Sequence, residues 1–199
     1  RTLDWDENEY KTEYWRVSAD GEDRYEFLGE DGGSGFQFSP QGTYLSFRRP
    51  VGEGQSRTQQ IFVMRMAGGE AVQLTEHDVS IASYEWSEDE SRIYFQADDE
   101  KPDSIAAEER KGADAIFVDE GPNGQNADQW QNLWVFDLES EESRQITDED
   151  FIIGSWDVAP DGERIALTAR YQNRRNDAYL NEIYLADVDD GELRRLNDN

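Results

Sequence analysis

The sequence predicts an all-β fold built from repeated four-stranded units, and three observations lead to this prediction. A seven-residue segment with aromatic or apolar residues two apart ahead of a turn occurs three times, at 36–42, 84–90 and 156–162. A tripeptide of the Gln-Leu-Thr type ends each unit, at 73–75, 145–147 and 195–197. Apart from 104–110, no segment has the apolar period of an amphipathic helix. Repeats of about 40–50 residues with several short strands each are typical of a β-propeller.

The repeats are 48 residues apart once a single insertion is removed. Ser39 and Ser87 are 48 residues apart, whereas Ser87 and Ala159 are 72 apart. The second unit carries the difference of 24, because Ser39 to Leu74 spans 35 residues and Ser87 to Ile146 spans 59. We therefore predict a partial propeller of about three and a half four-stranded antiparallel blades with a 48-residue period.

Alternating apolar residues identify the strands within a unit. The first strand carries Phe36 and Phe38, and the second carries Leu45 and Phe47. A spacing of two puts both side chains of a pair on one face of a half-buried strand. A third strand around Phe62 and a glycine-containing hairpin turn lead to the fourth strand.

A half unit precedes the first complete one, since stepping back 48 residues from Phe62 reaches Tyr14 in a similar strand pattern. We predict one propeller segment over 1–199 with a half blade at 10–28 and blades at 36–75, 84–147 (carrying the insertion 97–131) and 156–197. Because the chain starts at Arg1 in the middle of a unit and without a methionine, its natural N-terminus is expected to lie upstream.

The irregular segments all join a second strand to a third. They are 48–60, 97–131 and 170–181, together with the stretch before Tyr14. Because antiparallel strands alternate in direction, these connections and the links between blades are expected on the same face of the disc. Functional loops concentrate where a rigid scaffold presents them, so this face is the predicted contact face.

The charge of the chain excludes some partners. Net charge is −27, from 46 acidic against 19 basic residues, of which three are lysine. Such a surface repels phosphate, so no nucleic-acid partner is expected. Excess acid with scarce lysine is typical of proteins from salt-loaded cells, since molar salt shortens the Debye length to about 3 Å and screens self-repulsion. An acidic protein from a low-salt cell is the alternative.

Hydrophobic segments are short. No apolar run approaches the ~18 residues of a membrane helix, and no signal-peptide pattern opens the chain. We therefore expect no membrane insertion and a cytoplasmic location in a high-salt environment, with a periplasmic or secreted location as the alternative.

Catalytic and metal-binding patterns are incomplete. Gly32-Gly33-Ser34-Gly35 is the nearest match to Gly-x-Ser-x-Gly, but Phe36 follows where the motif needs its last glycine. The segment is therefore interpreted as a link between blades. His77 is the one histidine and is interpreted as a solvated link residue. The segment 187–192 resembles the start of a calcium loop but lacks its closing glutamate. With no cysteine either, we predict no catalytic residue, metal or cofactor in this chain.

The candidates for contact with substrate or with another domain are charged residues in the long connections, and most of these candidates are basic. Nine of the 19 basic residues lie in 48–60, 97–131 and 170–181, and arginine can bind a carboxylate with two parallel hydrogen bonds. The candidate contact residues are Arg48, Arg49, Arg174, Arg175 and Asp177. Solvated loop charges and local ion pairs are the alternative interpretation.

The Phe38-Ser39-Pro40-x-Gly42 turn, followed about thirty residues later by Gly68-Gly69 and Leu74-Thr75, resembles propeller repeats of the Tol-Pal type. Such repeats also form the N-terminal propeller of prolyl oligopeptidase family serine peptidases. The stretches 4–8, 98–134 and 173–177 are similar to the acylaminoacyl- and dipeptidyl-peptidase branches.

The resemblance implies a propeller that gates or positions peptide substrate for a separate α/β-hydrolase domain, which would hold the serine, aspartate and histidine. The parent protein would then be a serine peptidase, with no catalytic residue in this chain. The alternative is a Tol-Pal-like scaffold that binds proteins and has no enzymatic activity.

An open propeller leaves two blade faces uncovered. Four aromatic residues are expected to lose part of their cover there, namely Tyr14, Trp15, Trp156 and Tyr184. The half blade should also present an unpaired sheet edge. We therefore expect the chain to self-associate or to need the missing propeller blades as partners.

The charge generates a first prediction. Because 46 acidic residues repel one another in dilute buffer, the thermal unfolding midpoint should rise as KCl is increased to molar concentration. Calorimetry or circular dichroism across a KCl series measures this. A midpoint that stays flat or falls contradicts adaptation to high salt.

Overall fold

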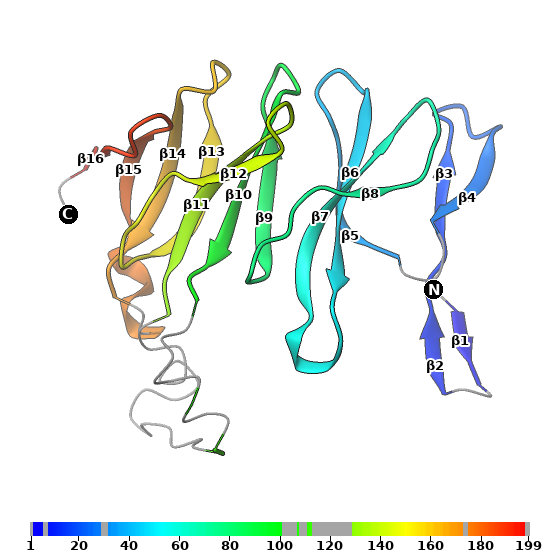
Figure 1. The fold of residues 1–199 in the computed structure, drawn as a ribbon, viewed down its shortest axis with the longest axis horizontal. Helices are drawn as coiled ribbons and strands as arrows, with labels where there is room; N and C mark the ends of the chain where they lie inside the picture. Colours follow the sequence, from blue (N-terminus) through cyan, green and yellow to red (C-terminus); the bar gives the residue numbers. More distant parts are fainter. Residues whose placement is uncertain are drawn as a thin grey trace.

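The computed structural model describes residues 2–5, 8–28, 32–100, 107, 111–112, 129–172 and 175–197. These residues form three four-stranded sheets and two two-stranded sheets, all antiparallel. The four-stranded sheets stand side by side as blades (Figure 1). The predicted all-β partial propeller is confirmed.

Each four-stranded sheet is a meander in which consecutive strands pair. Blade I contains β5 (Ser34–Phe38), β6 (Tyr44–Val51), β7 (Thr58–Arg65) and β8 (Val72–Gln73). Blade II contains β9 (Ile81–Trp86), β10 (Arg92–Asp98), β11 (Gln131–Asp137) and β12 (Glu142–Gln145). Blade III contains β13 (Ile152–Val158), β14 (Arg164–Arg170), β15 (Glu182–Asp187) and β16 (Leu193–Arg195).

The half blade consists of β3 (Tyr14–Val17) and β4 (Arg24–Leu28). The structure adds a hairpin that the sequence analysis did not predict, in which β1 (Thr2–Asp4) pairs with β2 (Glu9–Lys11). Leu3 lies opposite Tyr10, and the residues 48 positions later, Val51 and Thr58, also lie opposite each other in blade I. The β1–β2 hairpin is therefore equivalent to the distal end of the β6–β7 hairpin.

The turn between the first and second strands needs a left-handed residue. Gly42 and Gly162 supply it with φ of 73° and 71°, and in blade II Glu90 takes this conformation with φ of 61°. A side chain in this region costs energy, but the Glu90 carboxylate accepts a hydrogen bond of 2.7 Å from the backbone N–H of Gln41. Glu90 thus ties the turn of blade II to the turn of blade I.

A buried side-chain amide joins the third strand to the end of the fourth in blade I. Gln60 Oε1 accepts hydrogen bonds from the Thr75 hydroxyl and from the backbone N–H of His77, each 2.9 Å long. The backbone N–H of Ile61 donates to Thr75 Oγ1 at 2.9 Å. We call this arrangement the amide clasp, and both side chains in it are buried.

Blade II repeats the amide clasp with a shorter amide. Asn132 Oδ1 accepts hydrogen bonds from the Thr147 hydroxyl (2.8 Å) and from the backbone N–H of Glu149 (3.0 Å). The backbone N–H of Leu133 donates to Thr147 Oγ1 at 2.9 Å. The clasp explains why the repeated tripeptide ends in threonine, since its hydroxyl both donates and accepts in a buried place.

Blade III replaces the clasp with charged groups. Asn197 Oδ1 accepts from the backbone N–H of Ile183 at 2.7 Å, as threonine does in the other blades. Glu182 occupies the position that Gln60 and Asn132 occupy in the other two blades. Its carboxylate contacts Arg195 at 2.5 Å and the Tyr184 hydroxyl at 2.8 Å. The last blade thus keeps the strand connection but exchanges a buried amide for a partly exposed ion pair.

Aromatic side chains on the first strand of blade II pack against blade I and fill the seam between the two blades. The Trp86 indole N–H donates to Ser46 Oγ at 2.8 Å. The Tyr84 hydroxyl donates to the Gly35 carbonyl at 2.7 Å and lies 3.0 Å from Ser46 Oγ. Burial at this seam raises the pKa of Tyr84 to about 12. Each ring therefore contributes both apolar area and a satisfied polar group.

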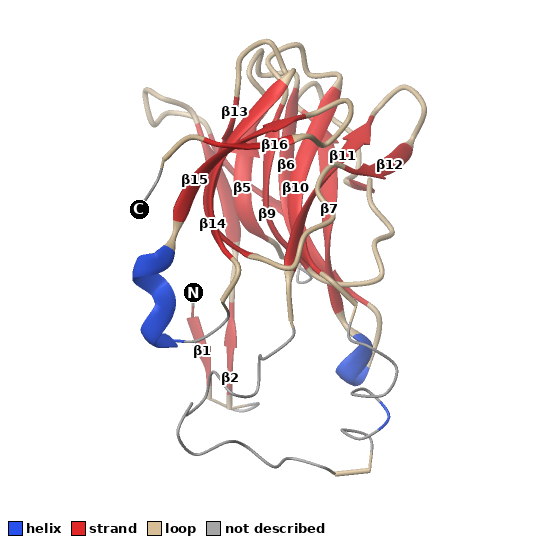
Figure 2. Cartoon of the chain, turned by 90° about the vertical axis from the view of Figure 1, so that its left-hand side faces the viewer, coloured by secondary structure: helices blue, strands red, loops and turns tan. Residues whose placement is uncertain are grey.

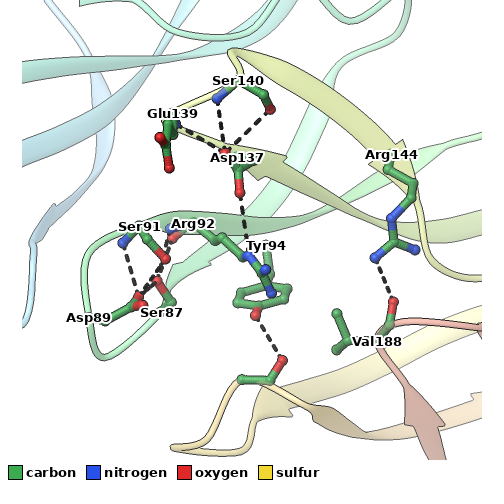
Figure 3. A network of polar contacts seen from close by, with 11 residues as sticks. Ser87, Asp89, Ser91, Arg92, Tyr94, Asp137, Glu139, Ser140, Arg144 and Val188 are labelled. Carbon is green, nitrogen blue, oxygen red and sulfur yellow. Dashed lines mark hydrogen bonds and ion pairs between the residues drawn. The ribbon is translucent and has the colours of Figure 1, made fainter.

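The seam between blades II and III uses the same kind of contact (Figure 3). The Tyr94 hydroxyl donates to the Gly162 carbonyl at 3.0 Å, and the Arg144 guanidinium donates to the Val188 carbonyl at 2.7 Å. The Trp156 indole N–H donates to Ser83 Oγ at 3.0 Å. Backbone carbonyls and side-chain oxygens thus accept hydrogen bonds from tyrosine, tryptophan and arginine side chains at both seams.

The four aromatic residues expected on open faces differ in exposure. Trp15 is 41% exposed, as expected, while Tyr14 and Trp156 are half-buried. Tyr184 is only 6% exposed, so the expectation for it was wrong. The reason is its orientation, because it packs in the core between blades II and III and against the Tyr171 ring.

The amide clasp generates a second prediction. Thr147→Val should lower the free energy of unfolding by about 1–3 kcal/mol, because it removes the acceptor of the buried Leu133 N–H and one of the two hydrogen bonds that Asn132 Oδ1 accepts. Thr168→Val is the matched control, since Thr168 is half-buried in β14 and water can replace its hydrogen bonds. Urea unfolding in molar KCl measures both, and equal losses would refute a special role for the clasp.

Candidate contact face

The long connections lie on one face of the blades, which we call the insertion face. It carries the β1–β2 hairpin and residues 52–57 with the 3₁₀ helix η1 (Gly54–Ser56). It also carries the described ends of the insertion (99–100 and 129–130), and residues 171–172 and 175–181 with the 3₁₀ helix η3 (Arg175–Leu180). Figures 1 and 2 show these segments on the lower side, opposite the short turns. The helical stretch expected at 104–110 lies outside the described residues, apart from Ala107.

Two predicted contact residues, Arg48 and Arg49, lie in strand β6 and not in a loop as expected. Arg48 Nη1 donates to the backbone carbonyl of Ile81, at 3.0 Å, and to that of Ala82 in the next blade. Arg49 Nε donates to the carbonyl of Gly32 at 3.0 Å. The β6–β7 pairing continues as far as Val51, so it carries both arginines into contact with neighbouring segments.

The other predicted contact residues belong to blade III. Arg175 and Asp177 lie in η3 on the insertion face, and Arg174 lies outside the described residues. Asp177 is half-buried in the first turn of η3. Because blade II stands between β6 and η3 (Figure 1), the structure does not bring the two groups of candidates together.

The structure reveals a small acidic pocket on the insertion face that the sequence analysis missed. Its volume is about 250 Å³. It is lined by His77, Asp78, Val79, Asp98, Asp99, Glu100, Trp134, Gln145 and Asp148. The lining comes from the link between blades I and II, the end of β10 with the residues after it, strands β11 and β12, and the link after β12. The amide clasp of blade I holds the first of these segments in place through the backbone of His77.

His77 is half-buried in this pocket, so its interpretation as a solvated link residue was wrong. Its ring lies edge-on to two aromatic rings, with centroids 4.7 Å from Trp134 and 5.3 Å from Phe95. Burial disfavours the charged imidazolium and lowers the pKa of His77, while the Asp78 carboxylate partly offsets this effect.

The carboxylate of Asp99 in the pocket is held by hydrogen bonds from one side chain. Asn132 Nδ2 donates to both of its carboxylate oxygens, at 2.9 and 3.1 Å, while Asn132 also forms the clasp of blade II. Burial raises the pKa of Asp99 despite these hydrogen bonds, and the nearby carboxylates of Asp148 and Asp150 raise it further. A cationic group entering here would relieve this crowding of negative charge.

The described residues set limits on other chemistry. Among them, no group of three or more histidine, cysteine or acidic side chains has an arrangement that could hold a metal ion. No helix in the described part of the chain is long and apolar enough to span a membrane. The pocket therefore offers negative charge and an aromatic wall around one imidazole.

A third prediction concerns the titration of His77. Its Hε1 resonance in a proton NMR titration should give a midpoint below 6.5, and Asp78→Asn should lower that midpoint further. Because the folded-state pKa lies below the unfolded value, this group's contribution to stability is complete above about pH 6.5 and decreases as pH falls. A midpoint at or above 6.5 would show that the imidazole is solvated.

Known structures share the propeller fold of this chain. No protein-family model matches the chain, and no curated protein matches it. Among solved structures, an acylaminoacyl peptidase from Pyrococcus horikoshii is similar with a TM-score of 0.66 and 22% identity, over 98% of this chain and 30% of that one. A putative TolB from Agrobacterium tumefaciens has a TM-score of 0.56 and 15% identity, over 96% of this chain and 57% of that one.

A third similar structure is an oligogalacturonate lyase from Vibrio parahaemolyticus, with a TM-score of 0.56 and 15% identity over 94% of this chain and 47% of that one. The chain spans about 30% of the length of the acylaminoacyl peptidases it matches. The chain therefore has the propeller fold found in acylaminoacyl peptidase, a protein of the prolyl oligopeptidase family, and in TolB-like proteins.

Proposed function

We propose that this chain is a non-catalytic propeller segment of a prolyl oligopeptidase-type serine peptidase, which gates or positions peptide substrate for an α/β-hydrolase domain. The observation that carries the proposal is the extent of the structural similarity. The similarity to acylaminoacyl peptidase covers 98–99% of the chain with TM-scores of 0.65–0.66, against 0.56 for the putative TolB.

The insertion face is the side we propose for substrate and for the hydrolase domain. The described parts of the long connections gather there on the set of blades (Figure 2), as is usual for functional loops. The acidic pocket gives this face a place for a cationic group of a peptide, such as an amino group or a basic side chain. Its negative potential would also speed the approach of such a peptide.

The catalytic triad is proposed to lie outside this chain. His77 is the one histidine of the sequence, and its ring lies against the rings of Trp134 and Phe95. A triad histidine must accept a proton from a serine hydroxyl while a carboxylate orients its other nitrogen. The packing of the His77 ring against two aromatic rings does not suit this role.

A protein-binding scaffold of the Tol-Pal kind is the second candidate function. The similarity to the putative TolB favours it in one respect, since it covers 57% of that chain against 30% of the acylaminoacyl peptidase. In this case the insertion face would contact another protein, and no hydrolase domain would be involved.

The acidic surface supports a proposal about the environment. We propose that the protein works in a high-salt cytoplasm, where its charge of −27 is screened. Acids of the links such as Glu76, Asp78 and Glu100 are exposed, so their mutual repulsion would respond directly to salt.

Activity-based labelling tests the proposed function. An extract of the source cells in molar KCl is treated with a fluorophosphonate probe, and the labelled proteins are digested and identified by mass spectrometry. Peptides of this chain should appear in a labelled protein much larger than 23.0 kDa. The isolated 199-residue chain serves as the control and should remain unlabelled.

The two candidate functions give different results. If peptides of this chain occur only in unlabelled protein, and its coding sequence continues into further propeller repeats without a Gly-x-Ser-x-Gly, the scaffold function is correct and the peptidase proposal is wrong.

A further inference from the structure

Strand β3 of the half blade has one free edge within the described part of the chain. It pairs with β4 on one side, and no described strand pairs with its other side. In blade I, the equivalent strand β7 pairs with β6 as well as with β8. A free strand edge presents unpaired N–H and C=O groups that can bind another strand.

The β1–β2 hairpin shows how a strand would approach this edge. Because β1–β2 is equivalent to the distal end of the β6–β7 hairpin, β1 occupies the place of the last residues of the second strand. A strand in line with β1 would run antiparallel to β3, as β6 runs along β7. The free edge is therefore continuous with strand pairing that the structure already contains.

An apolar groove of about 740 Å³ lies beside the free edge, between the half blade and blade I. Its apolar lining includes Trp15, Val17, Tyr25, Phe36, Phe38 and Leu45. Phe36 and Phe38 are 38% and 65% exposed, although they lie on the first strand of blade I. Burial of apolar side chains of this size is favourable, so the groove favours an apolar occupant.

The seam between blades I and II shows what covers these positions elsewhere. Tyr84 and Trp86, 48 residues after Phe36 and Phe38, are only 3% and 9% exposed. Tyr84 contacts Gly35 on the first strand of the preceding blade, and both aromatic residues contact Ser46 on its second strand. Two strands of the preceding blade, and not one, thus cover the aromatic pair.

We propose that the groove and the free edge of β3 together bind a two-stranded antiparallel β-hairpin. Its outer strand pairs with β3 in line with β1, and its apolar side chains cover Phe36 and Phe38. The repeat defines its chemistry: an aromatic-x-apolar strand, a Ser-Pro-x-Gly turn and an apolar-x-apolar strand. Since phenylalanine has no polar atom, the position equivalent to Ser46 needs no hydroxyl and accepts an apolar residue.

A peptide with the sequence of residues 34–51 tests this proposal, since it contains the first and second strands of blade I. Isothermal titration of the 199-residue chain in molar KCl should show binding with one peptide per chain. The same peptide with Ser46→Val should bind at least as tightly, because its hydroxyl has no partner in the groove.

Matched variants of the chain locate the binding site. Phe38→Asp should weaken binding by at least about tenfold. Val72→Asp should leave it unchanged, since Val72 is 62% exposed, close to the 65% of Phe38, but lies on β8 outside the groove. Thermal unfolding of both variants checks that they fold.

Several outcomes would overturn the proposal. One is the absence of binding, and another is equal binding to the Phe38→Asp and Val72→Asp variants. Equally tight binding of a single-strand peptide of residues 44–51 would mean that one strand suffices. A dimer of the chain alone that Phe38→Asp dissociates would mean that a second copy fills the groove.

Discussion

The amide clasp is the contact on which the insertion face depends. In blades I and II a buried amide oxygen receives a threonine hydroxyl and a backbone N–H of the link that follows. Unsatisfied, these buried groups would each cost about 1–3 kcal/mol, so only one register of the third and fourth strands is favourable. The clasp also fixes where the link leaves the blade, and it thereby places His77 and Asp99 in the acidic pocket.

Several polar contacts between blades do not pair opposite charges. Tyr94, Arg144 and Arg48 donate to backbone carbonyls of the next blade, and Trp86 donates to a serine hydroxyl. Screening weakens interactions between exposed charges much more than such hydrogen bonds, which are buried or part-buried. The chain can therefore carry a charge of −27 on its surface while the seams do not depend on ion pairs.

The sequence was sufficient to predict the fold because the period of 48 and the alternation of apolar residues are local signals. The clasp was not predictable, because Gln60 and Asn132 differ in length and lie 15 residues before their threonines. The role of Arg48 was missed because a charged residue near a strand end resembles a loop residue. Its partners are carbonyls of the next blade, which only the packing of blades brings close.

Hydrogen exchange at the links measures most directly whether the clasp holds the insertion face. The backbone amides of His77 and Glu149 lie in links between blades, yet each donates to a buried side-chain oxygen. They should exchange as slowly as the strand amides of Ile61 and Leu133, which bond to the clasp threonines, and should lose protection together with them. Exchange of the two link amides at unfolded-peptide rates, while the strands stay protected, would contradict this role of the clasp.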